Sequence, residues 1–195
     1  GIEFDTRFFK TDGKDPELAN QAAADKVIAD LKGAKFKVHQ IEQRERSRKP
    51  NAPFITSRLQ QEAARKLGFS AKKTMTLAQK LYEGVDLGEL GTHGLITYMR
   101  TDSVRVEPEA LASVREYIKA TYGAPSLPAE PNIYKSKKAA QDAHEAIRPT
   151  SLEFIPEKII NRLDRDDFRL YQLIWNRFVA SQMMPVVFDQ TAIDL

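Results

Sequence analysis

The chain has 195 residues, a net charge of +3 from 30 basic and 27 acidic side chains, and no cysteine. Disulfides and thiolate metal sites are therefore excluded, and the small basic excess does not establish nucleic-acid binding. No apolar run approaches the roughly 20 residues of a membrane-spanning helix, so we expect a soluble intracellular protein with no membrane partner.

Residues 1–53 have the pattern strand, helix, strand and basic connection. A Phe-rich run predicts a strand over Phe4–Lys10, and an apolar stripe from Leu18 to Leu31 predicts a helix, with Pro16 in its first turn. A loose alternation over residues 36–42 predicts a second strand. Residues 44–49 hold four positive charges in six positions. These charges attract phosphate, although a solvated linker is the plainer interpretation.

Residues 54–85 predict two helices joined by a tight turn. Ser57 and Gln60 have the spacing of a capping box at the start of the first helix, and Gly68 ends that helix. The second helix covers residues 71–83 and ends at Gly84. The pair resembles a helix-turn-helix unit, which can dock on DNA, but a packed helical hairpin is the favoured interpretation of this pattern alone.

The remaining elements complete an α+β prediction. We expect a strand over residues 94–102 and helices over residues 108–122 and 137–148, the latter stopped by Pro149. A further helix begins near Pro156, another covers residues 166–183, and a final strand covers residues 186–195. Both chain ends fall in strand-like runs, which indicates a piece of a longer protein.

The run GLITYMRTDS, residues 94–103, concentrates reactive side chains. On a strand, Tyr98, Arg100 and Asp102 point to one face. A tyrosine hydroxyl can form a covalent intermediate, and a nearby cation favours its ionised form. An arginine also binds phosphate through two hydrogen bonds. The alternative is a surface ladder of cross-strand pairs, which spacing alone favours.

The run QDAHEAIRPT, residues 141–150, offers a second cluster. On a helix, Gln141, His144, Glu145 and Arg148 share one polar face. His144 could donate to a phosphate or transfer a proton, and Arg148 could hold a second phosphate. The alternative is an ordinary last turn of a helix, where cations interact favourably with the helix dipole.

Taken together, these runs resemble the type IA DNA topoisomerases. GLITYMRTDS is similar to the active-site segment of that family, and QDAHEAIRPT to a downstream DNA-contacting motif. Residues 53–84 resemble the helical segment that precedes the tyrosine in bacterial members. LYQLIWNRFVASQM, residues 170–183, is similar to the helix that returns the chain to the neighbouring domain. The match covers about residues 44–195, in the order of the family.

The resemblance implies a reaction and roles. Tyr98 would attack a phosphodiester in one DNA strand and become joined to the 5′ phosphate, and Arg100 would lie against that phosphate. Asp102, His144 and Arg148 would bind DNA nearby. The other strand would pass through the gap before the break is resealed, which relaxes negative supercoils without ATP.

The resemblance also implies what lies outside this chain. Family members carry an acidic domain that binds Mg²⁺, and this sequence has no counterpart. Asp164, Asp166 and Asp167 cluster, but no apolar strand precedes them, and Asp166 suits the N-cap of a helix. We therefore expect no cofactor in this chain, no DNA relaxation by the chain alone, and a cytoplasmic enzyme at the bacterial nucleoid. Its partners would be a single-stranded segment of supercoiled DNA and the missing amino-terminal domain.

The expected architecture is a mainly helical tyrosine domain, residues 54–185, inserted into a small strand-rich hinge or gate domain. Residues 1–53 and 186–195 would form that second domain, so that the end strands would pair. Two other functions stay open at this point. The chain could be a non-catalytic DNA-binding helix-turn-helix module that contacts phosphates alone, or a regulatory protein with a tyrosine strand on its surface.

Overall fold

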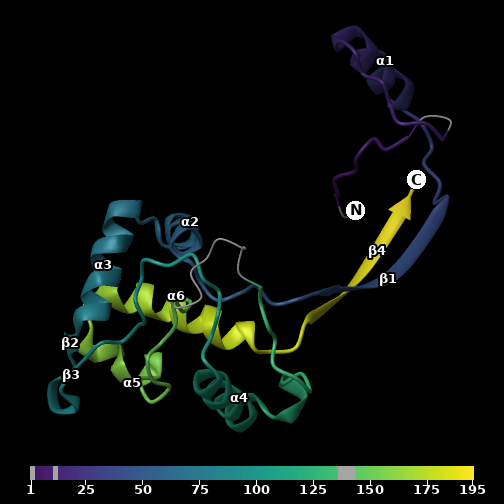
Figure 1. Cartoon of the computed structure of the whole chain (residues 1–195). Coiled ribbons are helices and arrows are strands. Elements are labelled where there is room, and N and C mark those ends of the chain that lie inside the picture. Colours follow the sequence, from purple (N-terminus) through teal and green to yellow (C-terminus); the bar gives the residue numbers. More distant parts are fainter. Residues whose placement is uncertain (1–2, 11–12, 136–143) are drawn as a thin grey trace. The chain divides into compact units, whose positions relative to one another are not determined.

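The computed structural model describes residues 3–10, 13–135 and 144–195 and is mixed helix and strand, as predicted (Figure 1). The α-helices are α1 (Gln21–Leu31), α2 (Thr56–Leu67), α3 (Ala71–Glu83), α4 (Pro108–Tyr122), α5 (Pro156–Ile159) and α6 (Arg165–Ser181). The 3₁₀ helices are η1 (Gly88–Leu90), η2 (Ala124–Ser126) and η3 (Ile160–Arg162). The strands are β1 (Gln40–Arg48), β2 (Val85–Asp86), β3 (Thr92–His93) and β4 (Val186–Asp194).

The chain divides into two compact units, one of residues 1–44 and 189–195 and the other of residues 45–188. Strands β1 and β4 form a two-stranded sheet, and the backbone N–H of His39 donates to the carbonyl of Asp194 at 2.7 Å. The predicted strand over Phe4–Lys10 is wrong, because these residues join no ladder and Phe4 is exposed. The second strand begins at Gln40 rather than at residue 36.

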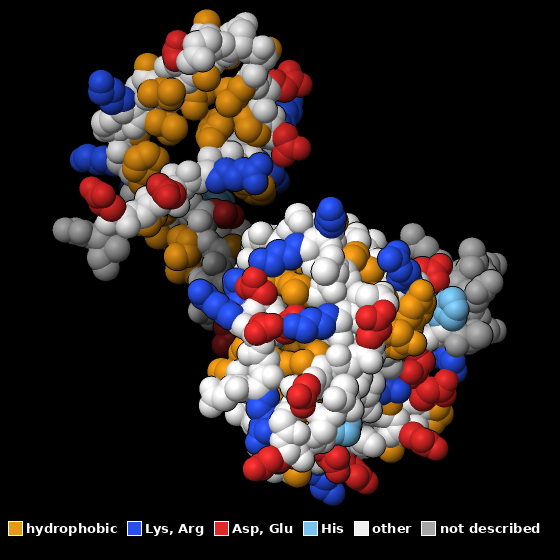
Figure 2. Space-filling model, turned by 90° about the vertical axis from the view of Figure 1, so that its left-hand side faces the viewer, with side chains coloured by type: hydrophobic (Ala, Val, Ile, Leu, Met, Phe, Trp, Pro, Cys, Tyr) orange, Lys and Arg blue, Asp and Glu red, His pale blue; other side chains and the backbone are white. Residues whose placement is uncertain are grey.

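The smaller unit carries many of its large apolar side chains on the surface (Figure 2). No residue of α1 is buried, and the buried hydrophobic cluster of the described residues lies wholly in the larger unit. The exposed apolar residues of the smaller unit include Phe4, Phe9, Leu18, Ile28, Leu31, Phe36, Val38 and Ile41. The described part of this unit therefore has no core of its own.

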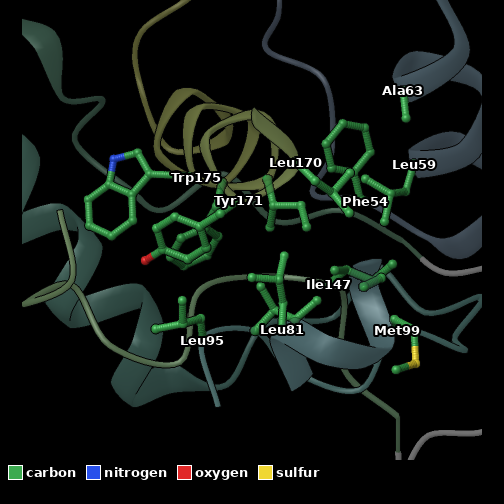
Figure 3. Packing of buried hydrophobic residues seen from close by; sticks show 14 of the residues in the cluster. Phe54, Leu59, Ala63, Leu81, Leu95, Met99, Ile147, Leu170, Tyr171 and Trp175 are labelled. Carbon is green, nitrogen blue, oxygen red and sulfur yellow. The ribbon is translucent and has the colours of Figure 1, made fainter. Parts of the chain in front are cut away.

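The larger unit is built around α6, which packs against α2, α3 and α5. Its buried side chains include Leu170, Tyr171 and Trp175 from α6 and Leu81 from α3 (Figure 3). The predicted helices over residues 71–83 and 108–122 match α3 and α4. Among the residues described, no helix has the length and apolar character needed to cross a bilayer.

A short turn joins α2 to α3. Gly68 adopts a left-handed conformation with φ of +72°, which favours glycine, and the Ser70 hydroxyl caps α3 by accepting from the Lys73 N–H at 3.2 Å. The predicted capping box of α2 is wrong, since its N-cap is Ile55 and no side chain caps it. The structure confirms the helical hairpin, and its action as a DNA-binding helix-turn-helix stays a prediction.

Ion pairs hold α3 against the first turn of α6. Lys80 contacts Asp164 at 2.8 Å and the buried Asp167 at 2.5 Å, and Lys73 contacts Asp166 at 2.5 Å. The hydrogen bonds that Lys80 donates to Asp164 and Asp167 raise its pKa above the ordinary value. The N-cap position of α6 is occupied by Asp164, so the expected N-cap role of Asp166 is wrong.

A second charged contact joins α2 to α6. The Arg177 guanidinium donates to the Glu62 carboxylate, and Lys66 contacts the same carboxylate at 3.0 Å. Arg177 also lies over the Phe54 ring, 4.6 Å from its centroid. Burial alone would raise the pKa of Glu62, but the bonds and charges of Lys66 and Arg177 lower it overall.

The Glu62 contact predicts a pH dependence of stability. A carboxyl whose folded-state pKa is lowered contributes stability above its unfolded value, near 4.5, and loses that contribution as pH falls through the folded value. We expect Glu62→Gln to unfold at a lower temperature than the unsubstituted chain at pH 7, and the difference to shrink as the pH falls towards 3. Thermal unfolding across this range measures it. Glu130→Gln, at an exposed glutamate, is the control, and parallel pH profiles for Glu62→Gln and the unsubstituted chain would contradict the prediction.

Candidate active site

The segment that carries Tyr98 is not a regular strand, because the backbone bends at Thr97, Met99 and Arg100. Within residues 94–102 the structure has a single isolated bridge, at Ile96. The predicted strand is therefore wrong, because these residues form no ladder of hydrogen bonds with a neighbouring strand. The alternation of faces is nevertheless present: Tyr98, Arg100 and Asp102 are exposed, whereas Met99 and Thr101 are buried. The segment thus exposes a phenol, a guanidinium and a carboxylate within five residues.

Residues 144–150 run beside the tyrosine segment and hold it by backbone hydrogen bonds. Ile96 forms an antiparallel bridge with Pro149, and the Thr97 N–H donates to the Arg148 carbonyl at 2.9 Å. The Thr97 hydroxyl donates to the carbonyl of Ala146 at 2.7 Å. The two motifs found in the sequence therefore form one structure.

This pairing corrects the helix predicted over residues 137–148. Residues 144–148 are not helical, and Ile147 forms a bridge with Phe54 instead. Residues 137–143 of that helix, with Gln141, lie outside the described residues. The physical reason is that Ile147 is fully buried, and its backbone N–H is satisfied by the Phe54 carbonyl at 2.8 Å.

The start of α2 anchors the other side of the tyrosine segment. The Thr56 hydroxyl donates to the Met99 carbonyl at 2.7 Å and accepts from the Thr101 N–H at 2.9 Å. The Thr56 N–H donates to the Thr101 carbonyl at 2.9 Å. The backbone on both sides of Arg100 is therefore fixed to a helix, which suits a site that must hold its geometry.

An open pocket of about 520 Å³ lies where this segment meets α2. Its walls are formed by Ile55, Thr56, Ser57, Arg100, Thr101, Asp102 and His144. The pocket thus brings together three of the five predicted site residues, Arg100, Asp102 and His144, from two separate parts of the chain. A guanidinium, an imidazole and the amino-terminal end of a helix favour an anionic ligand, whereas the Asp102 carboxylate does not.

Tyr98 is outside the lining of this pocket. Its side chain is 45% exposed, and its ring meets that of Tyr82 edge to face, with centroids 5.3 Å apart. Among the described residues, its hydroxyl forms no hydrogen bond. The oxygen is thus open to a substrate that reaches this face.

Arg148 does not face the pocket either, because Glu145 binds it. Two of its guanidinium nitrogens donate to the Glu145 carboxylate at 2.9–3.2 Å, and the third donates to the Pro149 carbonyl at 2.9 Å. Glu145 also accepts from the Glu107 N–H at 2.9 Å. Binding of Arg148 to a phosphate would have to replace this partner, so its predicted role stays a proposal.

Sequence reasoning missed three residues that shape this site: Thr56, Thr97 and Tyr82. The two threonines fix the backbone on either side of Tyr98, and Tyr82 contacts its ring. Thr56 and Thr97 had no usable signal, since their hydroxyls bond to carbonyls about fifty positions away. Tyr82 lies in the last turn of α3, where an aromatic side chain suits the core, yet 41% of its side chain is exposed.

No metal site is evident in the part of the chain that the structure describes. No group of three or more His, Cys, Asp or Glu side chains there could hold a metal ion. Asp164, Asp166 and Asp167, which cluster in the sequence, bind Lys73 and Lys80 instead. The described residues therefore do not fit a bound magnesium ion.

Gly94 allows the tyrosine segment to pass close to the end of α3. A Cβ atom at this position would lie 2.6 Å from the Tyr82 carbonyl oxygen, a backbone atom that cannot rotate away. We expect Gly94→Ala to destabilise the larger unit by about 1–3 kcal/mol, as overpacking does. Urea unfolding of the chain measures the change, and a midpoint equal to that of the unsubstituted chain would contradict this close approach.

Comparisons with known proteins agree on one family. A sequence model of the family described as DNA topoisomerase matches residues 2–195. The protein named DNA topoisomerase 1 from Rickettsia prowazekii is 53% identical over 173 residues, which is 88% of this chain and 22% of that protein. Its namesake from Xylella fastidiosa strain Temecula1 is 47% identical over 201 residues, which covers 98% of this chain and 24% of that protein.

A solved structure gives the same result for the fold. Full-length topoisomerase I from Thermotoga maritima superposes with a TM-score of 0.74 at 37% identity, covering 94% of this chain and 28% of that one. The chain thus spans about a quarter of the length of the relatives it matches.

Proposed function

The chain belongs to the DNA topoisomerase family, and from that premise we propose that Tyr98 is the nucleophile of a type IA reaction on single-stranded DNA. One observation carries the proposal: an exposed tyrosine lies on a segment whose backbone is hydrogen-bonded on both sides of it. Two residues further along the chain, Arg100 lines a pocket together with His144. The fixed backbone and the exposed oxygen are what a nucleophile in a preorganised site requires.

In the proposed reaction, the Tyr98 oxygen attacks the phosphorus atom of a DNA phosphodiester. A bond forms between this oxygen and the 5′ phosphate, the bond to the 3′ oxygen breaks, and the phenol proton passes in net to that leaving oxygen. The reverse attack by the 3′ hydroxyl restores the strand. The ester keeps the energy of the broken bond, so no ATP is consumed.

The other predicted residues have supporting roles in this proposal. Arg100 binds the scissile phosphate and stabilises its charge, because a guanidinium pairs well with phosphate oxygens. His144, which also lines the pocket, donates to a neighbouring phosphate, and Asp102 orients Arg100. Arg148 releases the Glu145 carboxylate and binds a DNA phosphate in its place. The hairpin of α2 and α3 would act as a helix-turn-helix that positions DNA.

The proposal places the metal and the partner domain outside this chain. A Mg²⁺ ion would serve the full-length enzyme by screening phosphate charge, and no step above is assigned to it. The larger unit would be the tyrosine domain, and the smaller unit would belong to a hinge or gate domain. Both depend on an acidic amino-terminal domain of the same protein, and the enzyme would act in the bacterial cytoplasm.

Covalent trapping tests the proposal. A full-length topoisomerase that carries this chain is mixed with single-stranded DNA and Mg²⁺, denatured, and examined for a protein–DNA adduct. We expect DNA labelled at its 3′ end to stay with the protein, DNA labelled at its 5′ end to be released, and the linked peptide to contain Tyr98. The 195-residue chain alone should give no adduct. A well-folded, DNA-binding enzyme without an adduct at Tyr98 would favour the non-catalytic binding module.

A further inference from the structure

Two exposed tyrosine rings, from separate elements, meet at the candidate active site. The rings of Tyr82 and Tyr98 have centroids 5.3 Å apart and planes inclined at 64°. This is the edge-to-face arrangement in which the positive edge of one ring meets the negative face of the other. The contact therefore restrains the orientation of both rings.

Tyr82 is the better anchored of the two. It lies in the last turn of α3, next to the fully buried Leu81. The Leu81 carbonyl accepts from the Leu95 N–H at 2.7 Å, and Gly94 passes directly against the Tyr82 carbonyl. The start of the tyrosine segment and the backbone of Tyr82 are thereby held together.

Tyr98 has a fixed backbone but few restraints on its side chain. Its neighbours Thr97 and Met99 are bound through a hydroxyl and a carbonyl. Its side chain is 45% exposed, and among the residues described Tyr82 supplies the one aromatic ring that it meets. A half-exposed side chain without a hydrogen bond exchanges between staggered rotamers, whereas attack on a phosphate needs the oxygen in one orientation.

We propose that Tyr82 is a positioning residue for the reaction: its ring holds the Tyr98 ring in the rotamer from which the phenol oxygen attacks. The inference rests on the proposed function of Tyr98. Tyr82 acts through its ring, and its hydroxyl is not required. Loss of the ring should slow the chemical step and leave DNA affinity unchanged, because Tyr82 acts on Tyr98 and not on the DNA.

Tyr122 provides a matched control within the same unit. It is also an exposed tyrosine at the end of a helix, at 51% exposure, and it also meets another ring edge to face, that of Tyr117 at 6.3 Å. It contacts no predicted site residue. The Tyr122→Leu variant therefore measures the general effect of removing an exposed tyrosine from a ring pair of this kind.

The experiment compares single-turnover cleavage of a single-stranded oligonucleotide by a full-length topoisomerase that carries this chain. The variants are Tyr82→Leu, Tyr82→Phe, Tyr122→Leu and Tyr98→Phe, each checked by circular dichroism. We expect Tyr82→Leu to lower the rate of adduct formation at saturating DNA about tenfold or more, with the Kd for DNA unchanged within about twofold. Tyr82→Phe should restore most of the rate, and Tyr122→Leu should not change it.

Each other outcome overturns the inference. Cleavage by Tyr82→Leu at the unsubstituted rate excludes positioning by the ring, and an equally slow Tyr82→Phe assigns the effect to the hydroxyl. A raised Kd with an unchanged maximal rate makes Tyr82 a DNA contact. If Tyr82→Leu does not fold, Tyr82→Met, which has a longer and more adaptable side chain, replaces it. An adduct that survives Tyr98→Phe rejects the proposed function itself, so the two failures are distinguishable.

Discussion

Tyr98→Phe should abolish covalent DNA cleavage by a full-length topoisomerase that carries this chain. The substitution removes only the attacking oxygen, whereas the ring that contacts Tyr82 and the anchored backbone remain. Removal of a catalytic nucleophile costs factors of about 10⁴ to 10⁶ in rate, so no adduct should be detectable. The measurement is the yield of protein-linked, 3′-labelled DNA after denaturation.

The controls for this prediction are DNA affinity and a second tyrosine. The phenylalanine variant should bind single-stranded DNA and unfold thermally like the unsubstituted enzyme, because the Tyr98 hydroxyl has no partner among the described residues. Tyr122→Phe, at a comparably exposed tyrosine, should cleave normally. An adduct formed by Tyr98→Phe, mapped to any other residue, would contradict the assignment of the nucleophile.

Phe54→Ala should cost the larger unit about 3–5 kcal/mol of unfolding free energy, as truncation of a buried aromatic side chain does. Phe54 is 1% exposed and lies in the core beside residues of α2 and α6 (Figure 3). The Arg177 guanidinium lies over its ring, and its backbone forms an isolated antiparallel bridge with Ile147. Removal of the ring would therefore leave a cavity where α2, α6 and the segment that carries His144 meet.

Urea unfolding of the chain measures this loss. Phe36→Ala is the matched control, because it makes the same truncation at a side chain that is 60% exposed, and the midpoint of the larger unit should not change. Equal midpoints for Phe54→Ala and Phe36→Ala would contradict the position of Phe54 in the core. Because Ile147 pairs with Phe54, we also expect Phe54→Ala to loosen the segment that carries His144.

The helices could be predicted from sequence because their signals are local. The run from Ala71 to Glu83 has an apolar stripe at helical spacing and is bounded by Ser70 and Gly84, and α3 has these limits. Pro108 and Gly123 similarly bound α4. The alternating exposure of Tyr98, Arg100 and Asp102 also follows the prediction from sequence, although the segment bends and forms no ladder.

The errors have the opposite origin, in contacts between distant residues. Ser57 and Gln60 have capping-box spacing, but the chain uses Thr56 to bind the carbonyls of Met99 and Thr101 instead. Residues 144–148 have a helical pattern of polar side chains. The bridge between Ile147 and Phe54, and the hydrogen bond from Thr97 to the Ala146 carbonyl, hold them in a non-helical conformation instead. A local pattern cannot show which distant carbonyl will accept a hydrogen bond.

The residue types of the candidate site and the family resemblance were thus available from the order of the amino acids, because motifs and helix signals are contained in short stretches. The arrangement of the site was not. Tertiary packing brings His144 and Arg100 into the lining of one pocket, binds Arg148 to Glu145, and sets the Tyr82 ring against Tyr98. The physical reason is that these contacts join segments separated by loops and helices, and the burial of one common core decides which segments meet.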